Sequence, residues 1–218
     1  MKKVILSAAA LFAFALSVQA QEAETPAFGF AEGNIIIEGN LSFGSTKDED
    51  VAGETKESNF NFNPKAGYFL TNKFAVGVEL GIGSTKEEES PVGAPTDEFK
   101  TNTFSAGVFG RYYFLDLGQR FKTYAELGVG FGSSKNEFNG TETSKVNGVN
   151  AGFDLGINYF VTQSFAINFG LANVLSYTSA TAEDPATSEE TKTNTFEGNL
   201  NVFNNFFSTA QFGLTYKF

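Results

Sequence analysis

The 218-residue sequence predicts a single all-β domain, an eight-stranded antiparallel up-and-down transmembrane β-barrel. Three observations lead to this prediction. Apolar residues recur at every second position in eight separate runs, short and long connections alternate between these runs, and the chain begins with the pattern of an export signal. The elements are taken below in chain order.

The N-terminal segment, residues 1–20, has the features of a signal peptide. Lys2 and Lys3 precede an apolar stretch over residues 4–16, and the small residues of Val18-Gln19-Ala20 mark the expected cleavage site. The apolar stretch is too short to cross a bilayer comfortably as a helix. We therefore expect residues 1–20 to be removed, residues 21–32 to form a short acidic periplasmic linker, and residues 33–218 to form the barrel.

The eight apolar runs have a period of two, which indicates β-strands with one apolar face. Charged residues inside the runs all have the opposite parity, which supports the strand assignment and the register. A soluble β-sandwich turns its apolar face inward and a membrane barrel turns it outward, so periodicity alone does not separate the two. The signal peptide, the aromatic content and the C-terminus favour the membrane. The runs cover 35–43, 60–68, 74–82, 104–114, 121–131, 149–159, 165–171 and 206–218.

The connections between the runs alternate strictly in length. Three are short, at 70–73, 115–120 and 161–164, whereas four are long and polar, at 45–58, 84–100, 133–146 and 178–195. Barrels of the outer membrane have short periplasmic turns and long external loops. We expect the long segments to be acidic, exposed loops and the C-terminus to be periplasmic. Residues 195–205 fit either strand eight or the last loop.

The C-terminal row Phe212, Leu214, Tyr216 and Phe218 resembles the signal by which outer-membrane barrels are recognised for insertion. The segment 63–69, followed by a short turn and Ala75-Val-Gly-Val, resembles the second hairpin of small porin-family barrels of the OmpA/OmpX type. This resemblance implies the Gram-negative outer membrane as location and no peptidoglycan-binding domain. It also implies outer-membrane lipid and lipopolysaccharide, periplasmic chaperones and the barrel-assembly machinery as partners. Pro64 lacks a donor for the sheet, so we expect a local bulge there.

Composition excludes several classes of chemistry. The chain contains no cysteine and no histidine, so it has no disulfide, no lipid-anchor cysteine and none of the Ser/His or Asp/His sites of known barrel enzymes. A pair among Glu79, Glu126 and Asp154 could act in acid–base catalysis, but such residues more often pair with lumen cations. The net charge of −10 argues against nucleic-acid binding. We expect no cofactor and no enzymatic activity.

Inward-facing charges predict an ion-pair network that closes the lumen. The turn near 71–72 places Lys65 and Glu79 at similar heights on adjacent strands, and the planar guanidinium of Arg111 can engage two carboxylates. Because an unpaired buried charge is costly, we expect these groups to pair, with an excess carboxylate protonated or in contact with lumen water. The predicted members are Glu38, Lys65, Glu79, Arg111, Glu126 and Asp154.

The cluster Asp48-Glu49-Asp50 is a candidate for weak divalent-cation contacts with lipopolysaccharide phosphates. A solvated loop is the favoured interpretation, because no spacing here matches a defined calcium loop, and no metal site is expected.

The predicted role is structural or surface-interacting, through the long acidic external loops and an extracellular ligand. The alternative is a small pore for ions or small solutes. The interior of an eight-stranded barrel is just filled by side chains, which favours the first role over the second.

Overall fold

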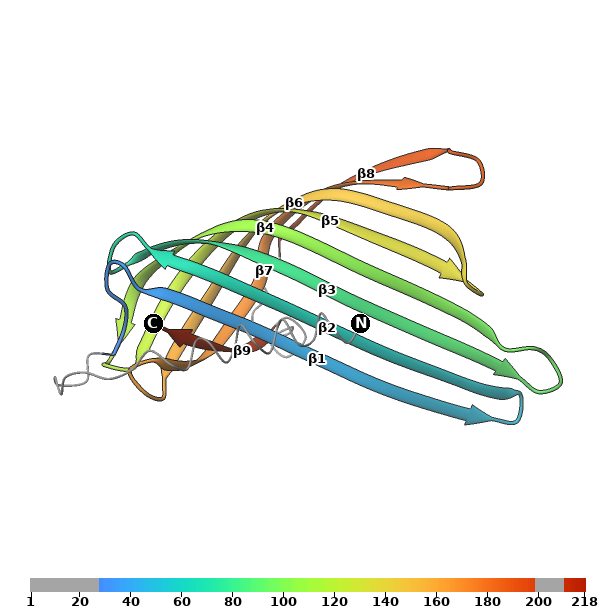
Figure 1. Cartoon of the computed structure of the whole chain (residues 1–218), viewed down its shortest axis with the longest axis horizontal. Helices are drawn as coiled ribbons and strands as arrows, with labels where there is room; N and C mark the ends of the chain where they lie inside the picture. The colour runs from blue at the N-terminus through green and yellow to red at the C-terminus, as the bar shows by residue number, and fades with distance from the viewer. Residues whose placement is uncertain (1–27, 199–209) are drawn as a thin grey trace.

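The computed structural model describes residues 28–198 and 210–218, which form an all-β protein of antiparallel strands (Figure 1). Within these residues, no helix is long and apolar enough to cross a membrane. The predicted signal peptide, and residues 21–27 of the predicted linker, lie outside the described part. The strands are β1 Ile35–Asp50, β2 Gly53–Phe69, β3 Phe74–Pro91, β4 Asp97–Leu117, β5 Phe121–Phe138, β6 Thr141–Phe160, β7 Phe165–Glu183, β8 Glu190–Gly198 and β9 Ala210–Lys217.

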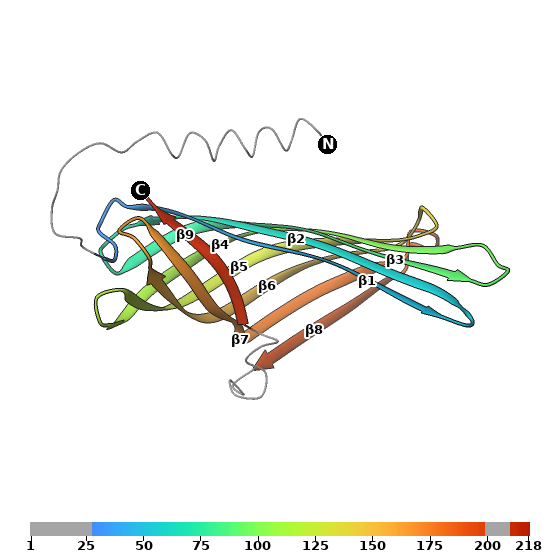
Figure 2. The same cartoon turned by 90° about the horizontal axis from the view of Figure 1, so that it is seen from below.

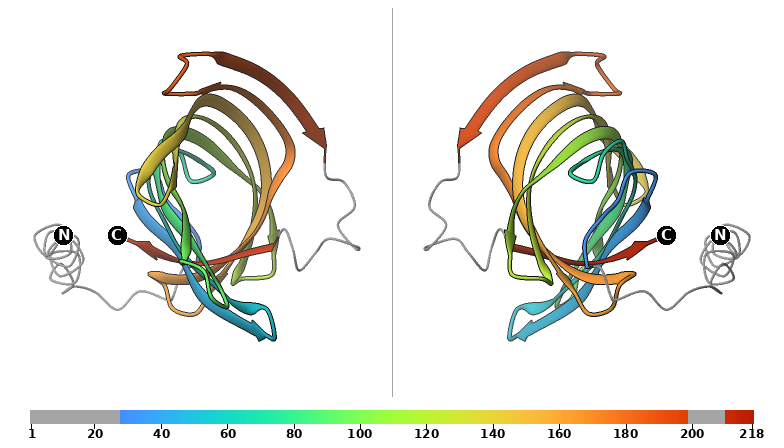
Figure 3. Two further views of the ribbon diagram at one scale, coloured as in Figure 1. Left: turned by 90° about the vertical axis from the view of Figure 1, so that its right-hand side faces the viewer. Right: turned by 90° about the vertical axis from the view of Figure 1, so that its left-hand side faces the viewer.

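The strands close into a barrel with eight positions, as predicted. Each strand from β1 to β7 pairs with the next, and β9 pairs with both β7 and β1, which joins the two ends of the sheet. Strands β8 and β9 lie along the same edge of β7, since Leu175 pairs with Gly198 and Leu171 pairs with Ala210. They therefore occupy the eighth position in two parts. The end-on views of Figure 3 show the resulting ring.

The open question about residues 195–205 is resolved for part of that segment. Residues 195–198 belong to β8 and pair with β7, whereas 199–205 lie outside the described residues. The predicted start of the last strand at Phe206 also lies outside them, and the strand is described from Ala210 onward.

The four segments predicted as long loops are in fact mostly strand, and this corrects the sequence prediction. The pairing of β1 with β2 continues to Asp50↔Gly53, and that of β7 with β8 to Glu183↔Glu190. Backbone hydrogen bonding continues beyond the apolar stripe because threonine, serine and paired charges alternate there in the same period of two. The hairpins all project at one end of the molecule, and the short turns and the C-terminus lie at the other (Figures 1 and 2). We call these the hairpin end and the turn end.

The two faces of the barrel wall differ as the alternation predicts. Apolar side chains such as Leu41, Val78 and Leu127 are exposed on the outer face, whereas Glu38, Arg111 and Glu126 are buried in the lumen. An aromatic girdle surrounds the turn end and comprises Tyr68, Phe74, Tyr112, Phe114, Tyr159, Phe165, Tyr216 and Phe218. Outward aromatic residues also mark the limit of the apolar band nearest the hairpin end, among them Phe43, Phe60, Phe104, Phe131, Tyr177 and Phe196.

The bulge expected at Pro64 is absent from the described strands. The register of β2 continues through this position against β1, where Pro64 lies opposite Gly39, and it is the same on both sides of Pro64 against β3. Register shifts occur instead in β4–β5, β5–β6 and β6–β7. One unpaired backbone position is therefore tolerated without an inserted residue.

Candidate functional site

Arg111 on β4 is the centre of the lumen and is only 1% exposed. Its Nη1 and Nη2 donate to the two carboxylate oxygens of Glu38 on β1, each at 2.7 Å. Its Nε donates to Oε2 of Glu126 on β5 at 2.6 Å. The planar guanidinium thus binds one carboxylate with two parallel hydrogen bonds and a second carboxylate at its edge, which suits its fixed geometry.

Lys65 on β2 extends this cluster across the barrel. Its Nζ lies 2.6 Å from Oε1 of Glu126 and 2.8 Å from Oε2 of Glu79. Register explains the contact with Glu79, which lies directly opposite Lys65. It also places Glu126 directly opposite Arg111, whereas the contact of Lys65 with Glu126 crosses the lumen from β2 to β5. Five of the six predicted residues therefore form one chain of ion pairs in the order Glu38–Arg111–Glu126–Lys65–Glu79. We call these five residues the lumen network.

Asp154, the sixth predicted residue, lies beside the lumen network and outside its chain of ion pairs. It is opposite Glu126 in the register of β5 and β6, and its Oδ1 accepts a hydrogen bond from the backbone N–H of Asn173 at 2.7 Å. A register shift between Phe153 and Leu155 brings that N–H into reach. No cation lies within ion-pair distance of Asp154 among the residues described.

Neutral polar side chains that the sequence analysis did not single out complete the site. Oε1 of Glu38 accepts hydrogen bonds from Thr215 Oγ1 at 2.8 Å and from Asn168 Nδ2 at 3.2 Å. Asn158, which is fully buried, donates to Thr215 and accepts from Tyr113. No buried side-chain nitrogen or oxygen in the described part lacks a hydrogen-bond partner. The sequence signal that could have identified these neutral residues is a polar side chain at an inward-facing strand position.

An aromatic layer fills the lumen on the turn-end side of Arg111. Phe30 stacks on Phe69 with ring centroids 4.3 Å apart, and it also contacts Tyr113 at 4.6 Å and Phe160 at 5.2 Å. Phe30 belongs to the segment predicted as a linker, which is held to the barrel by a hydrogen bond from Lys217 Nζ to the Gly29 carbonyl. Sequence reasoning missed this layer.

A glycine in the wall makes room for one large side chain of the lumen. A Cβ on Gly156 would lie 2.3 Å from the ring of Tyr124, so the close approach of strand and ring requires glycine here. Tyr124 in turn lies against the guanidinium of Arg111, with 4.1 Å between Cζ and the ring centroid.

Two cavities lie on the hairpin-end side of the aromatic layer. One of about 40 Å³ is lined by Asp154 and by four members of the lumen network, Glu38, Lys65, Arg111 and Glu126, and it has room for very few water molecules. The other, of about 290 Å³, lies further toward the hairpin end and is lined by uncharged polar groups such as Asn61, Ser105, Asn150 and Thr178. Around Arg111 the lumen is filled by side chains, since Arg111, Glu38 and Glu126 are all buried.

The other predicted residues lie at the periphery. Phe212 and Leu214 face outward on β9, and Phe218 forms two backbone hydrogen bonds with Ile35 at the seam of the barrel. The carboxylates of 48–50 diverge: Glu49 pairs with Lys47, and Asp50 accepts hydrogen bonds from the turn at Ala52 and Gly53. No group of three or more metal-ligating side chains occurs in 28–198 or 210–218.

Comparison with solved structures finds similarity to other outer-membrane proteins. OprG of Pseudomonas aeruginosa is 16% identical, with 87% of this chain and 98% of that chain covered and a TM-score of 0.51. Ail of Yersinia pestis is 18% identical over 86% of this chain and 99% of that chain, with a TM-score of 0.41. Outer membrane protein W of E. coli is 14% identical, with 86% and 99% covered and a TM-score of 0.42.

No curated protein sequence matches the chain significantly. A family model described as the outer membrane protein beta-barrel domain matches residues 6–218, nearly the whole sequence. The closed barrel, the outward apolar band and this match agree. The chain belongs to the outer membrane protein beta-barrel domain family and is located in the outer membrane.

Proposed function

We propose that this protein is a closed-lumen barrel with a structural and surface-interaction role, which presents its four hairpins outside the cell. The observation that carries the proposal is the position of Arg111, which is 1% exposed and bonded to Glu38 and Glu126 from opposite sides of the lumen. A solute would have to separate these ion pairs and displace the aromatic layer around Phe30. The free energy needed to leave several buried charges unpaired opposes a permanent pore.

The hairpins supply the interaction surface in this proposal. Strands β3 and β4 contain 18 and 21 residues, whereas a strand needs about 9–11 residues to cross a bilayer. About half of each strand therefore projects beyond the membrane as ordered sheet. Such a surface can bind an extracellular ligand with less loss of conformational entropy than a mobile loop.

A non-enzymatic role is part of the same proposal. The lumen carboxylates Glu38, Glu126 and Glu79 are each bound to a cation, and Asp154 accepts a backbone hydrogen bond. With no histidine in the chain, these contacts support a structural assignment for the carboxylates.

Protease treatment of intact cells tests the proposed orientation. We expect proteinase K to cut the hairpin tips at 92–96 and 184–189, because these residues are exposed and lie outside the paired strands, and to leave most of each hairpin intact. The turn-end connections at 118–120 and 162–164 serve as the internal control and should be cut only after the outer membrane is permeabilised. Cleavage at the turn end of intact cells, with protected tips, would show the opposite orientation.

A further inference from the structure

The outer face of the four hairpins repeats one pattern of side chains just beyond the apolar band. Each hairpin carries a pair of small polar residues, then a pair that contains lysine, then a pair of glutamates, at successive outward-facing positions. The polar pairs are Ser45↔Ser58, Ser84↔Asn102, Ser133↔Asn147 and Ser179↔Asn194; the next are Lys47↔Lys56, Lys86↔Lys100, Lys135↔Lys145 and Thr181↔Lys192; the outermost are Glu49↔Glu54, Glu88↔Glu98, Glu137↔Glu142 and Glu183↔Glu190.

These pairs form continuous bands along the sheet from β1 to β8. Between neighbouring hairpins the pairing is offset by two residues, so that a lysine of one hairpin lies opposite a glutamate of the next. Lys56 lies opposite Glu88, and Lys100 lies opposite Glu137. Strands of a barrel are tilted, and a stagger of about one residue per strand keeps equivalent positions at one height. We call the lysines of this pattern the lysine belt: Lys47, Lys56, Lys86, Lys100, Lys135, Lys145 and Lys192. We call the outermost pairs of glutamates the glutamate belt.

Cross-strand lysine pairs need a reason, because like charges directly opposite each other destabilise a sheet. Glutamates partly compensate them: Lys86 bonds to Glu88 and Glu98, each at 2.8 Å, and Lys135 bonds to Glu137 at 2.9 Å and Glu142 at 3.0 Å. These hydrogen bonds raise the pKa of Lys86 and of Lys135 above the usual value, so both remain cationic at neutral pH.

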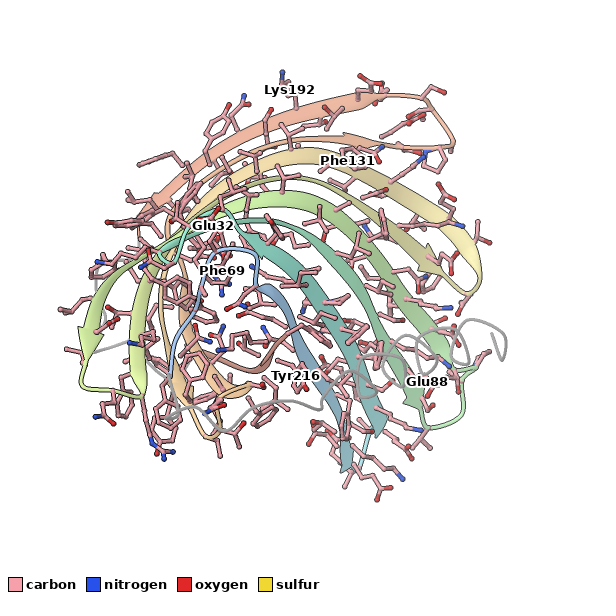
Figure 4. All side chains as sticks on the ribbon, turned by 60° about the vertical axis from the view of Figure 1, so that its left-hand side comes forward. Glu32, Phe69, Glu88, Phe131, Lys192 and Tyr216 are labelled. Atoms are coloured by element: carbon pink, nitrogen blue, oxygen red, sulfur yellow. The ribbon has the colours of Figure 1, made fainter. Side chains whose placement is uncertain are left out.

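Lys47 also pairs with two glutamates, Glu49 and Glu54, whereas the remaining four lysines of the belt are less compensated. Lys56 reaches Glu88 only at 4.0 Å, and Lys100, Lys145 and Lys192 have no ion pair among the residues that the structure describes. Lys192 lies on the outer side of the β7–β8 hairpin, away from the lumen (Figure 4). The belt therefore presents outward cations, three of which form no ion pair with any described residue.

We propose that the lysine belt binds the phosphate groups of anionic lipids in the leaflet at the hairpin end. That leaflet is the outer one if the orientation proposed above holds. Lys47 lies four residues beyond Phe43, which is roughly 13 Å along the strand at about 3.3 Å per residue and less in height because of the strand tilt. Lysine side chains extend back toward a membrane surface while their ammonium stays in the headgroup layer. The belt and the phosphate layer then meet, and the small serine and asparagine ring between belt and apolar band leaves space for headgroups.

Lipid selectivity of the reconstituted full chain tests this proposal. Wild type is placed in phosphatidylcholine vesicles with EDTA, and electron spin resonance measures the association of spin-labelled phosphatidic acid relative to spin-labelled phosphatidylcholine. A lysine near an anionic surface contributes about 1 kcal/mol, so we expect a preference on the order of fivefold for phosphatidic acid.

The matched variant exchanges charges between the belts without changing composition or net charge: E54K/K56E, E98K/K100E and E190K/K192E together. Each exchange moves a cation about 6–7 Å outward along its strand. We expect the preference to fall to about unity, while a control with Lys73→Gln and Arg120→Gln at the turn end keeps the wild-type value. Heat-modifiable electrophoretic migration verifies that each variant is folded.

Three results would overturn the proposal. The exchanged variant could retain the preference, which would assign it to net charge alone. The turn-end control could lose it, which would place the lipid contact at the other rim. The preference could require added Mg²⁺ and vanish in EDTA, which would assign it to the glutamate belt through bridging cations. Each result is independent of the protease experiment, because the vesicle assay does not depend on which end faces the cell exterior.

Discussion

Replacement of Arg111 by alanine is expected to destabilise the folded barrel by about 3–5 kcal/mol, the usual effect of removing one partner from a buried ion pair. The variant leaves Glu38 without its two guanidinium hydrogen bonds and Glu126 with Lys65 alone. Urea unfolding of the reconstituted protein, followed by heat-modifiable electrophoretic migration, measures the change in the free energy of unfolding.

Two matched variants show whether the effect arises from unpaired charge. Arg120→Ala removes an arginine that contacts backbone carbonyls at the turn end, so we expect a much smaller change. Adding Glu38→Gln to Arg111→Ala should restore part of the lost stability, because the amide carries no charge to leave unpaired. An Arg111→Ala barrel as stable as wild type would contradict the assigned role of the lumen network.

Replacement of Phe218 by alanine is expected to reduce assembly into the outer membrane severalfold without blocking export of the precursor. Phe218 ends the alternating apolar row of β9, packs against Tyr216 with ring centroids 4.7 Å apart, and bonds to Ile35 at the seam. Among the described residues, four pairs, Ile36↔Lys217 to Gly39↔Leu214, join β9 to β1, so the terminal contact is a substantial part of this described seam. Surface yield and the heat-modifiable fraction measure assembly.

Phe218→Tyr is the matched control, because it keeps the terminal aromatic ring and its packing on Tyr216. We expect near wild-type assembly for this variant. If Phe218→Ala also assembled normally, the C-terminal row would act as lipid-facing surface only and not as an insertion signal.

The strands and the centre of the lumen network were predictable because both depend on local pattern. A period of two fixes which side chains share a face, and a short turn fixes which residues face each other. Lys65 and Glu79 lie opposite each other for this reason. The contact between Arg111 and Glu38 crosses the barrel, and it followed from the need to pair inward charges in a narrow interior.

What the sequence did not reveal depends on longer-range geometry. The polar composition of the hairpins predicts loops, yet cross-strand pairs such as Ser45↔Ser58 continue the sheet. The contact of Phe30 with Phe69 and Phe160 joins a segment outside the strands to the last residues of β2 and β6, and no periodicity marks it. Asp154 bonds to the backbone of Asn173 instead of to a lumen cation because of a register shift between β6 and β7, and this shift has no signature in the sequence.

Single-channel recording of the wild-type protein in planar bilayers tests the closed lumen most directly. With the lumen network intact and the aromatic layer packed around Phe30, we predict no stable openings at neutral pH, and we predict that Arg111→Ala, where it folds, shows more current than wild type. A large, steady current from the wild type would contradict the closed lumen and would support a pore for ions or small solutes instead.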